Sequence, residues 1–289
     1  MRRTTLQRGA LQEMIRNLTT DKVAIACAVL VGLIAIVAIT APLLQKIGWI
    51  KNPYEMNLRD QVSPPSRLHA LGTDSYGRDL LSRLIFGARI SLSVGLVAVA
   101  ISTLFGLTFG LTAAYFGGVV DSLIMRLMDA LLALPPILLA LVFIATMGPG
   151  VKNVMLALGI VYSPRLARVV RAKALSVKEE TYVLAARAIG AAPIHIMLKH
   201  IVPNILGSVL VQIIVAYAYS IVAEAGMSFL GLGTQPPTPS WGLMMSEGKR
   251  YIVDAPWYLL FPGLAVSILV LSITLLGDRL RVALDPRQR

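Results

Sequence analysis

Few side chains of this 289-residue chain stand at spacings that catalysis or metal binding requires. The three histidines are His69, His195 and His200, and the last two lie five residues apart. We weigh a metal site at this pair against a solvated or docking surface, and we prefer the latter. The sequence has no G-x-x-x-x-G-K-[ST] phosphate loop, no H-E-x-x-H motif and no G-x-S-x-G elbow. We therefore expect no metal site, no cofactor and no ATPase or other enzyme activity in this chain alone.

A second group of ionisable residues stands at helical spacing ahead of a long apolar run. It consists of Asp74, Arg78, Asp79 and Arg83. Because leucines fall between and after these residues, we predict an amphipathic helix within residues 66–89, with its apolar side against lipid or protein. It could serve as a contact or gating surface, which we favour, or as a simple interfacial anchor.

The elements that must position these groups are mostly apolar. The chain is 56% hydrophobic and 15% charged, whereas soluble domains carry roughly a quarter charged residues. The charges cluster between apolar runs of about 20 residues, the length that a helix needs to cross a bilayer. We therefore predict an all-α integral membrane protein with six transmembrane helices. The predicted spans cover residues 22–44, 90–115, 122–147, 153–173, 205–232 and 256–277.

The formal net charge of +12 follows from membrane topology. With both termini in the cytoplasm, 17 of the 27 lysines and arginines fall on the inner side, as the positive-inside tendency requires. The basic loop 45–89 opposes this orientation, but long loops follow the rule less strictly. No basic patch is interleaved with aromatic residues, so we exclude nucleic acid as a partner. The first apolar run is too long for a secretory signal, and its Cys27 is expected to be a packing residue.

Charged residues and prolines near the inner half of the bundle have local explanations. Asp129 lies one turn beyond Arg126, which predicts an ion pair between them. The three arginines at positions 165, 168 and 171 are expected to anchor the fourth span at the interface. Pro164 is expected to interrupt this span, because proline removes a backbone donor and kinks a helix.

The charged segment between the fourth and fifth spans predicts a helix–turn–helix outside the membrane. Ser176 followed by Glu179 has the spacing of a capping box, so a helix is expected to begin directly after Ser176. Gly190 is placed to end that helix, since glycine accepts the left-handed backbone of a C-terminal cap. Pro193 suits the first turn of a second helix, and Pro203 is expected to mark its exit.

Residues 176–204 resemble the EAA loop of bacterial ATP-binding-cassette import permeases. The family pattern is E-A-A, three residues, G, nine residues and I-x-L-P, and Ala185, Ala186, Gly190 and Pro203 match it at the right spacing. Three positions depart from the pattern: Leu184 replaces the glutamate, His200 replaces the isoleucine and Val202 replaces the leucine. In the family, this loop docks into a cleft of the ATPase subunit, so the resemblance implies the same role here.

Three further stretches resemble the C-type subunit of the dipeptide/oligopeptide/nickel permease family. They read LGTDSYGRDLLSRLIFGAR (71–89), EAGMSFLGLGTQPPTPSWG (224–242) and GDRLRVALDPR (277–287). The resemblance implies the type I importer permease fold in a bacterial inner membrane. It also implies a homologous B-type permease, two ATPase subunits that bind ATP and Mg²⁺, and an extracytoplasmic solute-binding protein as partners. Peptides, glutathione-like molecules and nickel complexes are all solutes of this family.

Glu224 lies within the fifth apolar run, where a carboxylate is costly and constitutes a functional-site hypothesis. It could line the translocation pathway or pair with a cation of the sister permease. Alternatively, it braces a break around Gly226 near the outer surface, and the sequence leaves both interpretations open. In the first case, replacing Glu224 with glutamine is expected to impair uptake while assembly stays intact. The pair Pro135 and Pro136, which interrupts the third span, is also expected along the pathway.

The resemblance therefore divides the chain into three functional parts. Residues 1–65 hold a cytoplasmic arm, the first span and the start of the outer loop. Residues 66–89 form the outer amphipathic segment, and residues 90–289 form the importer transmembrane domain. The expected ATPase-coupling residues are Glu179, Glu180, Leu184, Ala185, Ala186, Arg187, Gly190, Lys199, His200 and Pro203. Asp74, Arg78, Asp79 and Arg83 are the expected outer gating or binding-protein contacts. The alternatives are an ion-gradient-driven secondary transporter, a channel and a membrane enzyme, none of which needs a docking loop for an ATPase.

Overall fold

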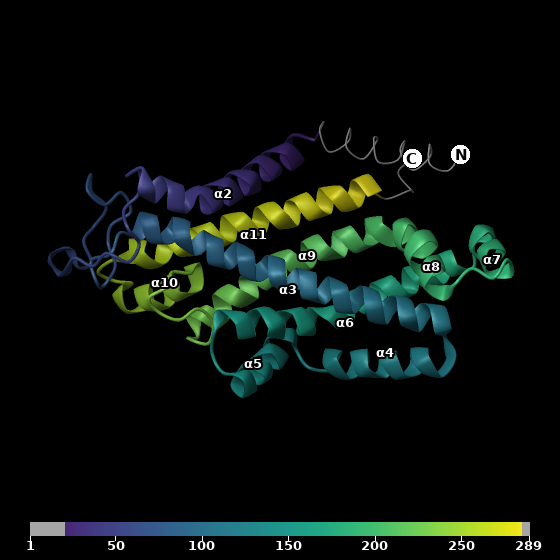
Figure 1. Cartoon of the computed structure of the whole chain (residues 1–289). Coiled ribbons are helices and arrows are strands. Elements are labelled where there is room, and N and C mark those ends of the chain that lie inside the picture. The colour runs from purple at the N-terminus through teal and green to yellow at the C-terminus, as the bar shows by residue number, and fades with distance from the viewer. Residues whose placement is uncertain (1–20, 285–289) are drawn as a thin grey trace.

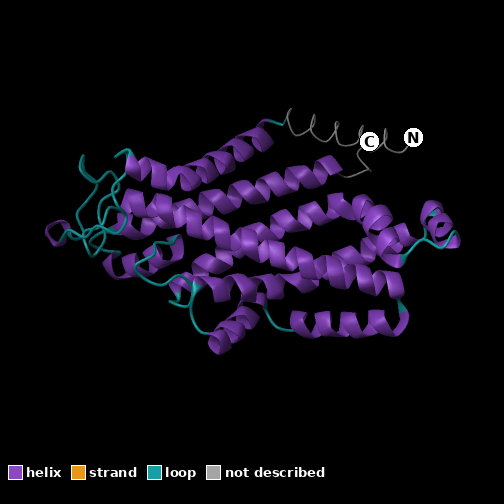
Figure 2. Ribbon diagram, in the orientation of Figure 1, coloured by secondary structure: helices purple, strands orange, loops and turns teal. Residues whose placement is uncertain are grey.

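The computed structural model describes residues 21–284, and this part of the chain consists of helices and loops without a strand (Figure 2). Two 3-10 turns, Leu58–Asp60 and Lys249–Tyr251, and a π-helical turn, Met197–Ile201, join the α-helices. The α-helices are α2 (Lys22–Lys46), α3 (Leu80–Phe116), α4 (Gly118–Leu132), α5 (Pro136–Met147), α6 (Val151–Lys178), α7 (Thr181–Ala188), α8 (Pro193–Ile196), α9 (Val202–Phe229), α10 (Trp241–Gly248) and α11 (Pro256–Leu284).

The long helices lie side by side in one bundle, with α3 near its middle (Figure 1). Helix α3 packs against α2, α6 and α9, and α11 packs against α2, α9 and α10. Helix α2 lies at the edge and exposes apolar side chains such as Val29, Leu33 and Ile39. An exposed apolar face on a helix of 25 residues fits contact with lipid, so the expected first span is confirmed.

Within residues 21–284, five helices are long and apolar enough to cross a membrane, and the count reaches six if α4 and α5 form one bent span. The prediction of one third span over residues 122–147 needs correction, because α4 and α5 meet at an angle of 91°. Pro136 forces the preceding residue out of the helical region, and Pro135 accordingly has φ −54° and ψ 135°. The two prolines thus end one helix and begin another instead of kinking a single one.

The expected interruption of the fourth span is wrong. Helix α6 runs from Val151 to Lys178 with Pro164 inside it. It packs along α3 at a glycine stripe, where a Cβ on Gly106 would lie 2.8 Å from Leu166 and one on Gly110 only 2.6 Å from the carbonyl oxygen of Ala167. The stripe lets the two helix backbones approach closely, which aligns the C-terminal half of α6 with α3.

The end of the bundle that the sequence predicts to face outward, called the outer end below, differs most from the sequence prediction. Helix α3 begins at Leu80, ten residues before the expected start, so the predicted amphipathic segment supplies its first turns. The side chain of Asp79 caps this helix by accepting a hydrogen bond of 2.9 Å from the backbone N–H of Ser82. The residues before Asp79 form a loop held by an isolated bridge between Thr73 and Asp79, not a helix on the surface.

The opposite end, called the inner end below after the predicted orientation, carries both described chain ends and the short helix α7 (Figure 1). Asp21, which caps α2, forms an ion pair of 3.2 Å with Arg279 near the end of α11. Helix α7 protrudes from the same end of the bundle, beyond the inner ends of α3 and α6. The N-terminal arm before Asp21 lies outside the described residues.

Candidate functional site

The loop between α6 and α9 forms a separate, protruding unit whose first helix is α7. The expected helix start after Ser176 is wrong, because α6 continues to Lys178 and α7 begins only at Thr181. Gly190 ends α7 as predicted: its φ is +80°, and the next backbone N–H bonds back to the carbonyl oxygen of Ala186 at 3.1 Å. A reversal this tight needs the left-handed backbone that glycine adopts without cost.

One face of α7 is fixed to the bundle. Val183 and Ala186 are buried in a cluster that also holds Leu111, Val170 and Ile205 from α3, α6 and α9. Lys178 adds a polar clamp, because its Nζ donates to the carbonyl oxygens of Ala114 and Tyr115 at the end of α3 at 3.0 and 2.8 Å. Helix α7 is therefore joined to three transmembrane helices through packed side chains.

The opposite face of the loop is exposed and partly apolar. Of the predicted coupling residues, Ala186 is buried and His200 is half-buried. The remaining predicted residues, all exposed, are Glu179, Glu180, Leu184, Ala185, Arg187, Gly190, Lys199 and Pro203. Ile189, Ile194 and Leu198 are also largely exposed, with Ile189 at 85%, and sequence reasoning missed them. Large exposed aliphatic side chains beyond the ends of the spans indicate a protein contact surface.

The second half of the loop is not the separate helix that the sequence predicts. Pro193 begins α8 as expected, but Pro203 is the second residue of α9 and no exit. Helix α8, the π-helical turn and α9 together run as one element from Pro193 to Phe229. The rings of His195 and His200 lie 5.7 Å apart, and no cluster of three potential metal-binding side chains occurs within residues 21–284. Helix α8 is therefore continuous with the long helix α9.

Two ion pairs join α4 to α6 near the inner end. Arg168 contacts Asp129 at 2.5 Å, and Arg171 binds both carboxylate oxygens of Asp121 at 2.5 Å. Two predictions are therefore wrong: Asp129 does not pair with Arg126, and two of the three arginines bind acids of α4 instead of serving as simple anchors. An arginine side chain reaches across to a neighbouring helix, and helical spacing alone cannot show this.

A buried charge network stands where the sequence predicts an outer surface segment. Arg78 and Arg83 are only 2% and 0% exposed, and both contact Asp74, with Nε to Oδ2 distances of 2.5 and 3.2 Å. Each also lies 3.4 Å from Glu247 of α10, which in turn accepts a hydrogen bond of 2.7 Å from Tyr258 of α11. Burial lowers the pKa of Arg78, but Asp74 and Glu247 raise it more, so it lies above its ordinary value.

This burial corrects the picture of exposed outer contacts. None of the four predicted residues presents an open surface in this chain, because Asp79 is also buried and accepts a hydrogen bond from His69 at 2.9 Å. The network instead joins the outer loop, α3, α10 and α11. Sequence reasoning missed Glu247, which lies more than 160 residues from its arginine partners, and Tyr258, which donates to Glu247.

Glu224 is enclosed by the chain. It is 1% exposed and accepts hydrogen bonds from the hydroxyls of Ser91 at 3.0 Å, Ser228 at 2.7 Å and Thr234 at 3.5 Å. The carboxylate thus joins α3 to the loop that follows α9 and faces neither an open cavity nor a free face of the bundle. This geometry supports the bracing interpretation over the pathway interpretation. Pro135 and Pro136 are exposed in the break between α4 and α5.

Comparison with known proteins identifies the family. Residues 106–289 match the model of the family described as "Binding-protein-dependent transport system inner membrane component". The chain belongs to this family. It is therefore a permease subunit of an importer, and the inner membrane is its location.

Relatives of this permease extend the match over nearly the whole chain. The dipeptide transport system permease protein DppC of Alkalihalophilus pseudofirmus is 40% identical over 278 residues, covering 96% of this chain and 90% of the relative. The glutathione transport system permease protein GsiD of Pectobacterium atrosepticum is 41% identical over 276 residues, with 96% and 91% covered. These matches confirm the resemblance to the dipeptide/oligopeptide family.

A solved structure confirms the fold. One chain of the MetNI methionine ABC transporter, in an inward-facing conformation, aligns with a TM-score of 0.56 at 20% identity. The alignment covers 70% of this permease and 96% of that chain. The permease therefore has the all-helical type I importer fold that the resemblance implied.

Replacing Glu224 separates the two interpretations of this carboxylate. A glutamine can keep the hydrogen bond from Ser228 and donate its amide to the hydroxyl of Ser91, so Glu224→Gln is expected to retain uptake above about half of the wild-type level. Glu224→Ala removes the acceptor of three buried hydroxyls and is expected to destabilise the permease by about 1–3 kcal/mol. Thermal unfolding in detergent and uptake in proteoliposomes measure both effects. Loss of uptake by the glutamine variant at full stability would instead support the pathway role.

Proposed function

We propose that this permease is the C-type subunit of an ATP-driven importer of short peptides, and that residues 176–204 pass the closure of the ATPase subunits to the membrane helices. The observation that carries the proposal is α7, which is packed onto three transmembrane helices on one face and exposes aliphatic side chains on the other. A docked element has to combine a rigid attachment with a free contact surface.

The exposed face of this loop suits a cleft with an apolar floor and a polar rim. Leu184, Ile189 and Ile194 would occupy the floor, since each is at least 44% exposed in this chain. Glu179, Glu180, Arg187 and Lys199 lie around them and would form charged contacts at the rim. The partner is an ATPase subunit that supplies the sites for ATP and Mg²⁺, which this chain does not provide.

The loop also orients the permease in the membrane. ATPase subunits are cytoplasmic, so α7 marks the cytoplasmic end of the bundle. The start of α2 and the end of α11 lie at the same end, held by the Asp21–Arg279 ion pair. Both termini are therefore cytoplasmic, and the loop 47–79 with α10 faces the outer side, where a solute-binding protein would deliver its cargo.

The proposed solute follows from the names of the relatives. Dipeptide and glutathione systems both carry small peptides with a free carboxylate. The translocation pathway would form between this chain and a homologous B-type permease, and ATP-driven closure of two ATPases would switch it between outward-open and inward-open states. Pro135 and Pro136, at the bend between α4 and α5, remain candidates for its lining.

Reconstitution tests the proposal. The permease would be purified together with the products of neighbouring genes and placed in lipid vesicles with its binding protein and a labelled dipeptide. We expect an ATPase to co-purify, and dipeptide uptake to require ATP. Uptake that follows a proton or sodium gradient with no associated ATPase would overturn the proposal in favour of a secondary transporter.

A further inference from the structure

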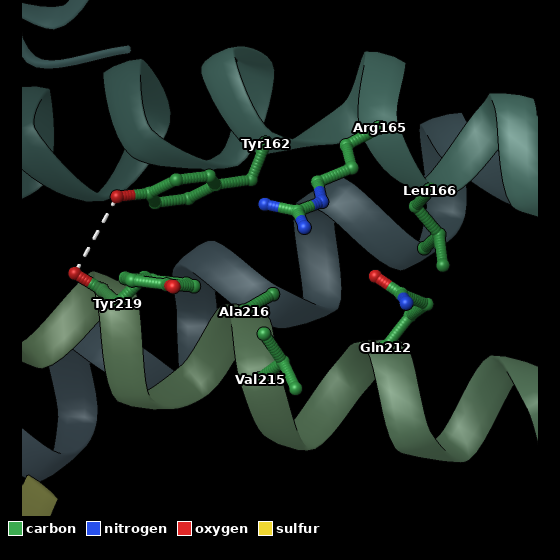
Figure 3. A pocket seen from close by; sticks show the side chains of 7 residues that line it. All are labelled: Tyr162, Arg165, Leu166, Gln212, Val215, Ala216 and Tyr219. Atoms are coloured by element: carbon green, nitrogen blue, oxygen red, sulfur yellow. Dashed lines mark hydrogen bonds between the residues drawn. The ribbon is translucent and has the colours of Figure 1, made fainter. Parts of the chain in front are cut away.

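A small groove between α6 and α9 has polar side chains along its walls, halfway along both helices (Figure 3). Tyr162 and Arg165 come from α6, whereas Gln212 and Tyr219 come from α9. The Tyr162 hydroxyl donates to the backbone carbonyl of Tyr219 at 3.4 Å, which closes one end of the groove. Apolar side chains complete its walls: Leu166, Val215 and Ala216.

Arg165 is the cation nearest the middle of α6. It is the fifteenth of the 28 residues of α6, so at 1.5 Å per residue it lies about 20 Å from either end of the helix. The adjacent Leu166 packs at Gly106, well inside α3. A charged side chain in the middle of a helix that is long and apolar enough to span a membrane is costly and constitutes a functional-site hypothesis.

No acidic side chain among the described residues neutralises the charge of Arg165. The neighbouring Arg168 and Arg171 have acidic partners in α4, whereas Arg165 is exposed and has neither an ion pair nor a hydrogen bond within residues 21–284. Its groove contains hydroxyl and amide groups but no carboxylate. The site thus offers a guanidinium and several hydrogen-bond donors to an anion that the permease itself does not supply.

We infer that Arg165, with Gln212 and Tyr219, binds the carboxylate of the transported solute. A planar guanidinium binds a carboxylate by donating two parallel hydrogen bonds, and the Tyr219 hydroxyl and the Gln212 amide can donate to its remaining lone pairs. The inference rests on the proposed peptide import. The cavity of about 20 Å³ holds little more than one water molecule, so the solute lies along its open side, where a sister permease would form the opposite wall.

Charge-selective uptake tests this site. Vesicles with the assembled importer would take up alanyl-alanine, which has a free carboxylate, or its C-terminal amide. Arg165→Gln is expected to lower uptake of the free peptide about tenfold or more, and uptake of the amide less than about twofold. Arg168→Gln, in an arginine already paired with Asp129, is the matched control and is expected to affect both peptides equally. Equal losses for both peptides in Arg165→Gln would overturn the inference.

Thiol labelling provides a second test that needs no transported amide. Cys27 is the one native cysteine, so a Cys27→Ala background leaves Ala216→Cys in the groove as the single target. In the assembled importer, a negatively charged methanethiosulfonate is expected to react with this cysteine about tenfold faster when Arg165 is present than in Arg165→Gln. No labelling in any state would mean that the sister subunit closes the groove, and equal rates would mean that Arg165 attracts no anion. Either result would overturn the site.

The two tests separate this inference from the proposed function. If the wild-type complex shows no ATP-driven uptake, the importer assignment fails. If wild-type uptake is normal and Arg165→Gln behaves like Arg168→Gln, only the carboxylate site fails.

Discussion

Gly190→Val is expected to lower ATP-driven uptake about tenfold or more while the ATPase subunits stay bound and continue to hydrolyse ATP. Gly190 has φ +80°, a left-handed conformation that costs a β-branched residue about 1–2 kcal/mol. No atom lies within 4 Å of the position of an added Cβ, so the effect would come from the backbone and not from a clash. The strained turn would shift α7 relative to α8, and with it the contact that couples ATPase closure to α9.

The size of the effect follows from coupling between two distant sites. Allosteric coupling changes the affinity of one site by a factor of about 5 to 150 when the other site is occupied. Misplacing the coupling element is expected to remove most of that effect. Parallel assays of ATP hydrolysis and peptide uptake in the same vesicles measure the loss. Wild-type uptake per ATP in the valine variant would contradict a coupling role for this turn.

Gly231→Val is the matched control. Gly231 also has φ +80° with open space around its Cα, but it follows α9 at the outer end. The same strain there is expected to lower stability without changing the ratio of uptake to ATP hydrolysis. A similar change of this ratio in both variants would indicate a general effect of strain.

The sequence predicts the bundle well where local chemistry decides the structure. The apolar runs mark the long helices because a bilayer demands about 20 apolar residues in each. Gly190 marks the end of α7 because few other residues accept its backbone conformation. Pro135 and Pro136 correctly indicate a break, but the angle of 91° depends on how α4 and α5 pack against α6.

The outer charge network could not be predicted from spacing. Asp74, Arg78 and Arg83 fit a helical repeat, yet Gly77 within that stretch has φ +70° and places its backbone against Asn57. The glycine is the signal that argues against a helix there. No sequence motif around Glu247 indicates its role, because that role depends on α10 lying beside the start of α3.

The groove at Arg165 shows a similar limit. The three-residue spacing of arginines 165, 168 and 171 suggests one shared role, but the structure divides them by partner. Two arginines pair with acids on α4, whereas Arg165 points toward α9 (Figure 3). Only the packing of three helices decides which charge remains open to a ligand.

Glu247→Gln is expected to be the most destabilising single change at the outer end, at about 3–5 kcal/mol. The network holds two cations, Arg78 and Arg83, and two anions, Asp74 and Glu247, and three of the four side chains are at most 2% exposed. Removing one anion leaves a net positive charge in a buried site. The glutamine keeps the volume and can still accept the hydrogen bond from Tyr258, so the loss would report the charge and not a cavity.

Thermal unfolding in detergent measures this loss, with an expected fall in the midpoint of about 5 °C or more. Asp129→Asn is the control, because it breaks the Arg168–Asp129 pair, whose side chains are about half exposed, and is expected to cost no more than about 1 kcal/mol. Equal shifts in the two variants would contradict the view that burial makes the outer network strong.

A double variant tests whether the network acts as one unit. Arg83→Met removes a buried cation, so in combination with Glu247→Gln it restores the balance of charge around Arg78 and Asp74. The double variant is expected to be less destabilised than the sum of the two single ones by about 1 kcal/mol or more. Strict additivity would mean that Arg83 and Glu247 stabilise the outer end separately. In that case the loop, α3, α10 and α11 would be joined by independent contacts instead of one shared cluster of charge.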